Sequence, residues 1–218
     1  MFKIEDWGLI SYKEAYQKQK EIVKSINENR INNVNNSILV VCEHPTVITI
    51  GKSGTIDNVL FDEETLKTKN VELTFTDRGG DVTLHNPNQL VGYPIFDLSY
   101  YKQDLHWFLR EIEECIIELV ALYGIQSTRV DGLTGVWIDD IDKSKQRKIC
   151  AMGLHCSRWI TSHGFALNVN NDLTEFEYII PCGIREKEVT SIYKETNKII
   201  PISELKIKTI EIFNNHFK

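Results

Sequence analysis

The chain has 218 residues, 42% of them hydrophobic and 26% charged, which suits one globular domain over residues 1–218. Its net charge of −6 argues against nucleic acid as a partner, because phosphate binding needs a dominant basic surface. No apolar run is long enough for a membrane span, and residues 1–9 lack an apolar signal core. Five cysteines without a Cys-x-x-Cys pair indicate free thiols, so we expect a cytoplasmic protein with no membrane association.

Three helices and a series of short strands are predicted. Ser11 with Glu14 forms a capping-box pair before a run of helical spacing, residues 104–123 form a second helix, and Ser203 caps a third over residues 203–217. Strands are predicted at 37–42, 47–51, 71–77, 81–84, 90–96, 135–138, 148–154, 157–162 and 165–168. Strand clusters between long helices, without β-α-β alternation, predict an α+β fold with a mixed sheet packed by helices.

Residues 77–89 combine an arginine with paired glycines. Gly79 and Gly80 let the backbone approach a ligand closely, and Arg78 has the geometry to orient a carbonyl or an anion. The plainer interpretation is a tight hairpin with a solvated arginine, and His85 taken singly is more often structural than catalytic.

Two further segments carry polar side chains into apolar runs. Lys148 leads from a polar loop into a strand, where desolvation disfavours a charged group, although a lysine that extends to solvent from a strand start is commoner. His163 precedes Gly-Phe-Ala within residues 161–170, which suits either a pocket lining or a strand turn.

Among the cysteines, Cys182 is the best candidate for a nucleophile. A proline and a glycine flank it at the end of an apolar run, where a constrained turn presents the sulfur. The other four occupy predicted helix or strand positions and are expected to be structural: Cys42, Cys115, Cys150 and Cys156.

In this order the motifs resemble the lipoyl(octanoyl) transferase family of lipoate biosynthesis. The resemblance covers the chain from about His44 to its end and implies the fold shared by biotin and lipoate protein ligases. The matching stretches are residues 78–80 with His85 and Pro87, then 89–94, 135–137, 148–149 with Gly153, 157–159, 161–170 and 181–184.

The resemblance implies transfer of an octanoyl group from octanoyl-acyl carrier protein to a lysine of a lipoyl-dependent enzyme domain, the first step of endogenous protein lipoylation. Cys182 would carry the acyl group as a thioester, and Lys148 would be its catalytic partner. The acceptors would be lipoyl domains of 2-oxoacid dehydrogenases or the glycine cleavage H protein, with no cofactor and no metal. The implied acyl pocket is lined by Arg78, Gly79, Gly80, Asp81, Val82, Thr83, Leu84, His85, Ala151, Met152, Gly153, Gly164, Phe165 and Ala166.

The chain departs from the family at several positions. Asn86-Pro87-Asn88 replaces the usual Gly-Pro-Gly, Leu84 stands for a common tyrosine, and Asp81 stands for a common glutamine. Asparagine tolerates left-handed backbone, so we expect the turn to persist. An acidic carrier would need a local basic patch, although an ordinary solvated loop is the alternative interpretation. The candidates for that patch are Lys143, Lys145, Arg147, Arg185 and Lys187.

Two other functions fit the same fold. An ATP-dependent lipoate–protein ligase would form an adenylate and need no thiol, but such ligases typically carry three glycines after the arginine, and here only two are present. A non-catalytic module that binds lipoyl domains or carrier protein would not require Lys148 and Cys182. The transferase is therefore preferred, and its mechanism requires these two residues to meet, with either His85 or His163 as a further proton carrier.

Overall fold

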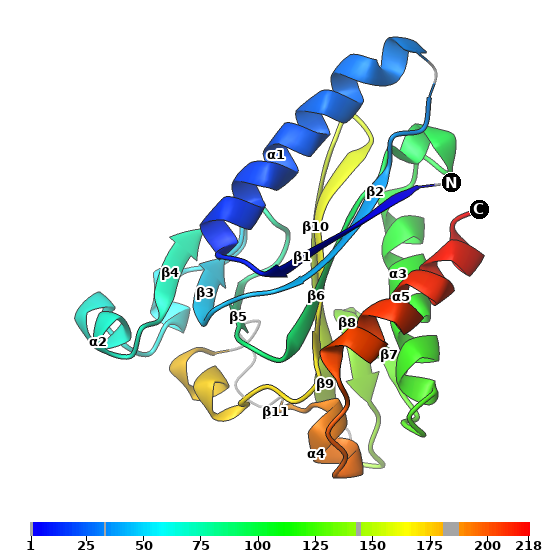
Figure 1. Cartoon of the computed structure of the whole chain (residues 1–218). Coiled ribbons are helices and arrows are strands. Elements are labelled where there is room, and N and C mark those ends of the chain that lie inside the picture. Colours follow the sequence, from blue (N-terminus) through cyan, green and yellow to red (C-terminus); the bar gives the residue numbers. More distant parts are fainter. Residues whose placement is uncertain (1, 33, 143–144, 181–187) are drawn as a thin grey trace.

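The centre of the molecule is an eight-stranded mixed sheet (Figure 1), and the computed structural model describes residues 2–32, 34–142, 145–180 and 188–218. Seven strands follow the order β1-β2-β6-β10-β9-β8-β7, and β11 pairs with β9. The β1–β2 and β11–β9 pairs are parallel, and the other pairs are antiparallel. The strands are β1 (Lys3–Leu9), β2 (Ile38–Glu43), β6 (Gln89–Ile95), β7 (Thr128–Val130), β8 (Leu133–Ile138), β9 (Arg147–Ser157), β10 (Ile160–Asn168) and β11 (Glu188–Val189).

A second, three-stranded sheet lies at one end of the molecule, on the left in Figure 1. Its order is β4-β3-β5, with β3 parallel to β4 and antiparallel to β5. Apolar side chains that include Ile48, Leu84 and Phe176 form a separate core cluster with this sheet. Its elements are β3 (Val47–Ile50), β4 (Glu72–Phe75), β5 (Val82–His85) and the short helix α2 (Glu63–Thr68).

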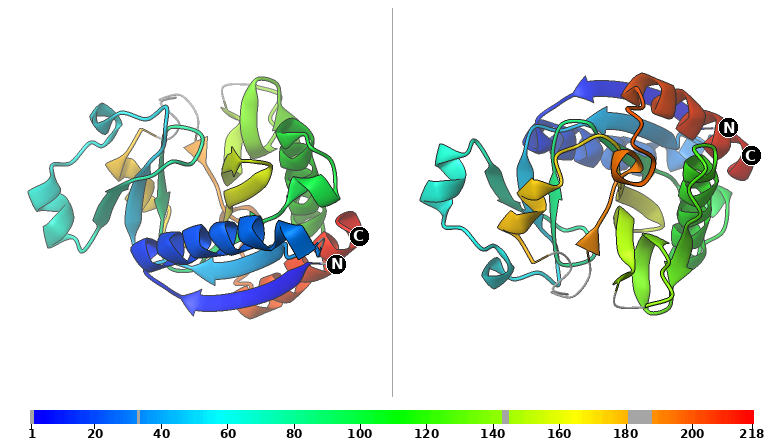
Figure 2. Two further views of the ribbon diagram at one scale, coloured as in Figure 1. Left: turned by 90° about the horizontal axis from the view of Figure 1, so that it is seen from above. Right: turned by 90° about the horizontal axis from the view of Figure 1, so that it is seen from below.

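Helix α1 (Tyr12–Asn29) covers one face of the main sheet, as the views from above and below also show (Figure 2). Ser11 Oγ accepts a hydrogen bond from the Glu14 amide at 3.2 Å, which confirms the predicted cap. The buried side of α1 meets strand residues such as Val40 and Ala166. Each side chain buried in this way contributes about 1.5–3 kcal/mol.

Helices α3 (Leu105–Ala121) and α5 (Ile202–His216) cover the opposite face and pack on each other. Phe108 and Ile116 of α3, Phe213 of α5 and Phe165 of β10 belong to this larger cluster. The remaining helical segments are α4 (Ile192–Thr196) and the 3-10 turns η1 (Arg30–Asn32), η2 (Ile56–Asn58), η3 (Leu98–Tyr100) and η5 (Thr174–Tyr178). The predicted α+β class, a mixed sheet packed by helices, is confirmed.

Two predicted boundaries were wrong. The strand expected over residues 157–162 is interrupted: Ser157 ends β9, Arg158 and Trp159 form the turn at φ +52° and +64°, and Ile160 begins β10. A two-residue turn with both φ positive matches the twist of the flanking strands, which explains the sharp reversal. Helix α5 begins at Ile202 with Pro201 as its N-cap, so Ser203 lies inside the helix rather than capping it.

Several elements were not predicted at all. Strand β1 is polar, half exposed and held at the sheet edge by parallel pairing with β2, so its own sequence carries little signal. Helix α2, helix α4 and strand β11 are too short to show a period. Within the described ranges, the helices all fall short of the length or apolarity that crossing a membrane would demand.

A buried ion pair ties the end of α1 to the end of β6. The guanidinium of Arg30 donates two hydrogen bonds of 2.7 Å to the fully buried carboxylate of Asp97. Burial alone would raise the pKa of Asp97, but the hydrogen bonds from Arg30 and Ser99 outweigh it and hold the pKa below its usual value.

We predict that Arg30→Ala lowers the free energy of unfolding by about 3–5 kcal/mol, because it leaves a buried carboxylate uncompensated. Urea denaturation at pH 7 measures the loss, which should shrink as the pH falls through the pKa of Asp97 and its carboxylate is protonated. The control is Lys24→Ala, which removes an exposed 3.9 Å pair with Glu28 and should cost less than about 0.5 kcal/mol. Equal stabilities of the two variants would contradict the assignment.

Candidate active site

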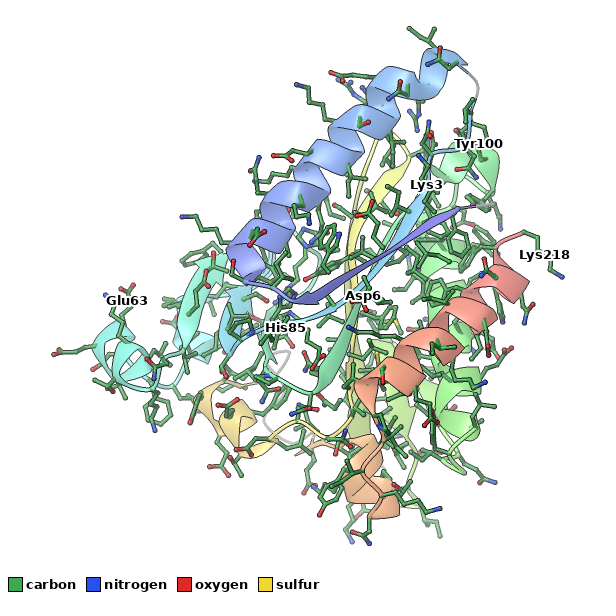
Figure 3. All side chains as sticks on the ribbon, in the orientation of Figure 1. Lys3, Asp6, Glu63, His85, Tyr100 and Lys218 are labelled. Atoms are coloured by element: carbon green, nitrogen blue, oxygen red, sulfur yellow. The ribbon has the colours of Figure 1, made fainter. Side chains whose placement is uncertain are left out.

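A cavity lies between the small sheet and the face of the main sheet that α1 covers; we call it the central cavity. The space between its walls is about 520 Å³ with the adjoining open solvent included. His85, at the end of β5, is labelled in Figure 3. The lining residues are Tyr12, Arg78, Gly80, Asp81, Val82, Thr83, His85, Val91, Tyr93, Lys148, Ala151, Met152, Gly153, His163, Gly164, Phe165 and Ala166.

Small residues on two paired strands leave room for the central cavity. Ala151 lies opposite Ala166, and Gly153 lies opposite Gly164, across the β9–β10 pair. A Cβ atom added at Gly153 would come within 2.5 Å of the carbonyl oxygen of Gly79, so the backbone there accepts no side chain. These four strand residues line the central cavity. Their predicted contact with an acyl group stays a prediction.

The loop that follows β4 closes over this floor and is held by Arg78. Its guanidinium donates to the Thr49 hydroxyl at 3.0 Å and to the carbonyl oxygens of Thr49 and Asp81 at 2.6 and 2.7 Å. The Gly79 amide donates to the Leu154 carbonyl of β9 at 2.9 Å. Arg78 is 8% exposed, so the solvated-arginine interpretation was wrong, and these donors are engaged by the backbone rather than directed to an anion.

Lys148 stands at the border of the central cavity. Its Nζ lies 4.6 Å from the ring centroid of Trp137, a cation–π contact on a buried indole. The Lys148 carbonyl accepts from the Thr190 amide at 2.9 Å, and β11 pairs Val189 with Lys148. Cys182 falls outside the described residues, so the expected meeting of Lys148 and Cys182 stays a prediction.

The two candidate histidines differ in their partners. His85 Nδ1 lies 2.8 Å from the Gln89 side-chain oxygen, and burial with the nearby His44 lowers the pKa of His85 to about 3. His163 Nε2 lies 2.8 Å from Asp77, and burial lowers its pKa although the Asp77 carboxylate opposes that shift. At neutral pH His85 is therefore uncharged and suits proton acceptance better than anion binding.

Two of the sequence-predicted lining residues, Leu84 and Gly79, are placed elsewhere. Leu84 is fully buried in the core cluster of the small sheet, because it points away from the cavity wall that Thr83 and His85 form. Gly79 lines a neighbouring groove. Asp81 does border the cavity, and its carboxylate accepts a 2.7 Å hydrogen bond from the side-chain amide of Asn58.

The asparagine turn after His85 persists as expected. Asn88 has φ +66°, the left-handed conformation that asparagine tolerates. Asn86 is buried and its amide donates to the Asp172 carbonyl at 2.8 Å and to Glu175 at 2.6 Å. The side-chain hydrogen bonds of Asn86 therefore tie this turn to the segment that carries Asp172 and Glu175.

The predicted basic patch receives little support from its described members. Arg147 donates to both carboxylate oxygens of Glu195, at 2.6 and 2.7 Å, so its guanidinium is engaged within the chain. Lys145 is exposed and lies 3.7 Å from Asp142. Three other candidates lie outside the described residues: Lys143, Arg185 and Lys187.

Four lining residues were absent from the predicted acyl pocket: Tyr12, Val91, Tyr93 and His163. Val91 and Tyr93 alternate on β6, where the register places Val91 opposite Ala166. That alternation was visible in the sequence, but the pairing of β6 with β10 was not. Tyr12 reaches the site only because α1 crosses the sheet there.

A second depression, here called the side groove, meets the central cavity at Lys148. It encloses about 1,040 Å³ including open solvent, and the two share Gly80, Asp81, Lys148, Met152 and Gly153. Its far wall comes from the start of α3 and the β7–β8 turn. Lys148 therefore borders both depressions.

Comparison with known proteins identifies a family. The family model of the lipoyl protein ligase A/B catalytic domain matches residues 11–214 of this chain. An octanoyltransferase of Cytophaga hutchinsonii is 46% identical over 212 residues, 93% of this chain and 87% of that protein. An octanoyltransferase of Christiangramia forsetii is 44% identical over 225 residues, 99% of this chain and 95% of that protein.

Solved structures show the same fold at low identity. A bipartite lipoate protein ligase of Thermoplasma acidophilum superposes with a TM-score of 0.70 and 16% identity, over 98% of this chain and 82% of that one. LipL1 of P. falciparum in complex with lipoate gives a TM-score of 0.73 and 12% identity, over 100% of this chain and 62% of that one.

We predict that Arg78→Lys lowers the free energy of unfolding by about 1–3 kcal/mol, because the single ammonium group of lysine cannot make all the hydrogen bonds that the forked guanidinium donates to Thr49 and Asp81. Hydrogen exchange of the Gly79 amide should accelerate in parallel. Arg158→Lys, at an exposed position of the β9–β10 turn, is the matched control and should cost less than about 1 kcal/mol. An unchanged Gly79 exchange rate in Arg78→Lys would refute the role given to the fork.

Proposed function

Because this chain belongs to the family of lipoyl protein ligase A/B catalytic domains, we propose that it transfers an octanoyl group during protein lipoylation. It is an acyltransferase, as its octanoyltransferase relatives are. In our proposal the donor is octanoyl-acyl carrier protein, and the acceptor is a lysine of a lipoyl domain of a 2-oxoacid dehydrogenase or of the glycine cleavage H protein.

The observation that carries the proposal is a mostly apolar cavity that opens beside Lys148. The described residues on either side of the Cys182 segment support it. Ile180 donates to the carbonyl of Asn58, whose side chain binds Asp81 at the cavity, and Val189 pairs with Lys148. The described residues on both sides of positions 181–187, Ile180 and Val189, are thus linked by hydrogen bonding or strand pairing to elements that border the cavity.

In the first step the Cys182 thiolate attacks the thioester carbonyl of the octanoyl donor. A new carbon–sulfur bond forms, the donor's carbon–sulfur bond breaks, and the carrier's thiol leaves with the proton that Cys182 gave up. An unperturbed cysteine has a pKa near about 8.5, so a nearby ammonium group that stabilises the thiolate would speed this step. Lys148 is the residue we assign to that role.

In the second step a lysine amine of the acceptor domain attacks the acyl-enzyme. An amide forms, the Cys182 thiolate leaves, and the amine's excess proton passes to a base. Since a free lysine has a pKa of about 10.4, a base at this point matters, and Lys148 in its neutral form is our candidate. Thioester exchange is nearly balanced and the amide is more stable, so the sequence of steps needs no ATP.

The central cavity suits the acyl chain. Each buried methylene contributes about 0.8 kcal/mol, so an octanoyl tail supplies roughly 5 kcal/mol before ordering costs. Ala151, Gly153, Gly164 and Ala166 leave the space for the chain. An alkyl chain needs no hydrogen-bond partner along its length.

We predict that incubation with octanoyl-carrier protein, without ATP, adds one octanoyl group at Cys182, as detected by peptide mass spectrometry. Cys182→Ala should abolish the adduct because it removes the nucleophile. The matched control is Cys156→Ala on β9, which should acylate like the wild type. Persistence of the adduct in Cys182→Ala would exclude this nucleophile, and a strict ATP requirement would favour an adenylate-forming ligase.

We also predict that Lys148→Ala slows formation of the acyl-enzyme by about 10²-fold or more, because it removes the ammonium group that stabilises the Cys182 thiolate. Carrier-protein affinity, measured by calorimetry, should change little. Lys208→Ala, an exposed lysine of α5 paired with Glu211, is the control and should keep the wild-type rate. A wild-type acylation rate in Lys148→Ala would remove the residue from the mechanism.

A further inference from the structure

The motif Gly135-Val136-Trp137 lies on β8 beside Lys148, and the proposed function gives it no role. Trp137 pairs with Lys148 across the β8–β9 ladder. Its side chain is 1% exposed, and Lys148 Nζ lies 4.6 Å from the ring centroid. A cation within about 6 Å of an aromatic ring is attracted to its face, and tryptophan attracts it most strongly. The motif therefore gives an attractive contact to the lysine that the proposed mechanism needs.

The pairing of β8 with β9 contains one extra residue on β9. Val136 lies opposite Cys150. The next residue, Trp137, lies opposite Lys148, so Ile149 has no partner on β8. Such a β-bulge changes the direction of nearby side chains and is common next to active sites. Ile149 and Cys150 are both fully buried, and both belong to the larger core cluster that α3 and α5 cover.

The bulge decides which face of the main sheet carries Lys148. Side chains of a regular strand alternate between the two faces, so without the bulge Lys148 would share the buried face of Cys150. Because two successive side chains of β9 occupy that face, Lys148 falls instead on the face of Ala151, and both residues line the central cavity. One extra residue thus moves the lysine from the core to the cavity.

Gly135 leaves room for the stem of the lysine. A Cβ atom added there would lie 2.4 Å from the Cys150 carbonyl oxygen and 3.7 Å from Lys148 Cδ, so the lysine side chain runs beside this glycine. The backbone at Gly135 has φ +107°, a conformation that residues with a side chain rarely adopt. The stem of Lys148 therefore lies beside the first residue of the motif, and its amine lies at the ring of the third.

We propose that Trp137 is a positioning residue for the acyl transfer, which holds the Lys148 amine at the border of the central cavity. The inference rests on the proposed function, because that mechanism gives Lys148 its role. Trp137 is absent from the described residues that line the central cavity and the side groove, so it acts through Lys148 and not by touching a substrate. Its ring attracts the ammonium group that stabilises the Cys182 thiolate. Without the ring, the flexible four-carbon stem of the lysine would let the ammonium group leave that place.

The position of the amine can be measured without the reaction. Reductive methylation with isotope-labelled formaldehyde converts lysines to dimethyl-lysines that keep their charge, and protons over the face of an aromatic ring resonate upfield. We expect the Lys148 methyl signal, assigned by its loss in Lys148→Arg, to lie upfield in the wild type. In Trp137→Leu it should move to the position of the exposed lysines. Lys18, whose Nζ lies 4.5 Å from the ring centroid of Trp7, is the internal reference for an upfield signal.

The rate of acylation tests the role of this contact in the reaction. Trp137→Leu should slow formation of the acyl-enzyme by about tenfold, which is within the range of a cation–π contact, and should leave the affinity for octanoyl-carrier protein unchanged. Trp137→Phe keeps an aromatic face and should stay within about threefold of the wild-type rate. This variant sacrifices no hydrogen bond to a described residue, because Trp137 Nε1 has no partner among them.

The matched control is Trp7→Leu, which removes a Trp–Lys contact of nearly the same length away from Lys148. It should move the Lys18 signal and leave both the Lys148 signal and the acylation rate at their wild-type values. Because leucine leaves a gap at a buried tryptophan, thermal melting checks that Trp137→Leu is folded. If it is not, the wild-type spectrum and the rate of Trp137→Phe decide the matter.

A wild-type Lys148 signal at the position of the exposed lysines would overturn the inference. A wild-type acylation rate in folded Trp137→Leu would also overturn it, as would a loss in Trp137→Phe that exceeds the loss in Trp137→Leu. A wild type that forms no acyl-enzyme would instead reject the proposed function. In that case the Lys148 signal would still decide whether Trp137 holds the amine.

Discussion

The hydrogen bond from the Gly79 amide to the Leu154 carbonyl joins the small sheet to the main sheet. That contact is the backbone hydrogen bond that ties the loop after β4 to β9, so it helps to hold the roof of the central cavity. Arg78 stiffens the same loop from within by binding Thr49 and Asp81. The buried arginine thus stabilises the site through the backbone, and its charge is neutralised by carbonyl dipoles at close range.

Lys148 and the apolar walls lie in different parts of the central cavity. Lys148 and the side groove lie at the open end, where a thioester and its carrier must arrive. The walls further in include His85, which burial keeps uncharged at neutral pH, and Arg78, whose guanidinium is bound by Thr49 and Asp81. This arrangement keeps polar chemistry at the mouth and lets the interior accept an alkyl chain with little desolvation cost.

The fold class and most elements could be predicted from the sequence, because apolar periodicity and capping residues are local signals. Ser11 and Asp104 mark the starts of α1 and α3 as expected. The hairpin at Arg158 and Trp159 was missed because neither arginine nor tryptophan is a residue type that indicates positive φ. The site was predicted where a family motif covered it, whereas Tyr12 and Tyr93 enter it only through α1 crossing the sheet and through strand pairing, which no local pattern reveals.

The contact of Gly153 with the carbonyl of Gly79 has a consequence for how such a scaffold can diversify. On that side the chain segments touch backbone to backbone, and even a methyl group would have to displace one of them. Substitutions that change the size of the cavity are therefore expected where side chains form its walls, as Val91 and Met152 do. New acyl preferences in this fold would arise by substitution of those side chains, while Gly79 and Gly153 stay unchanged.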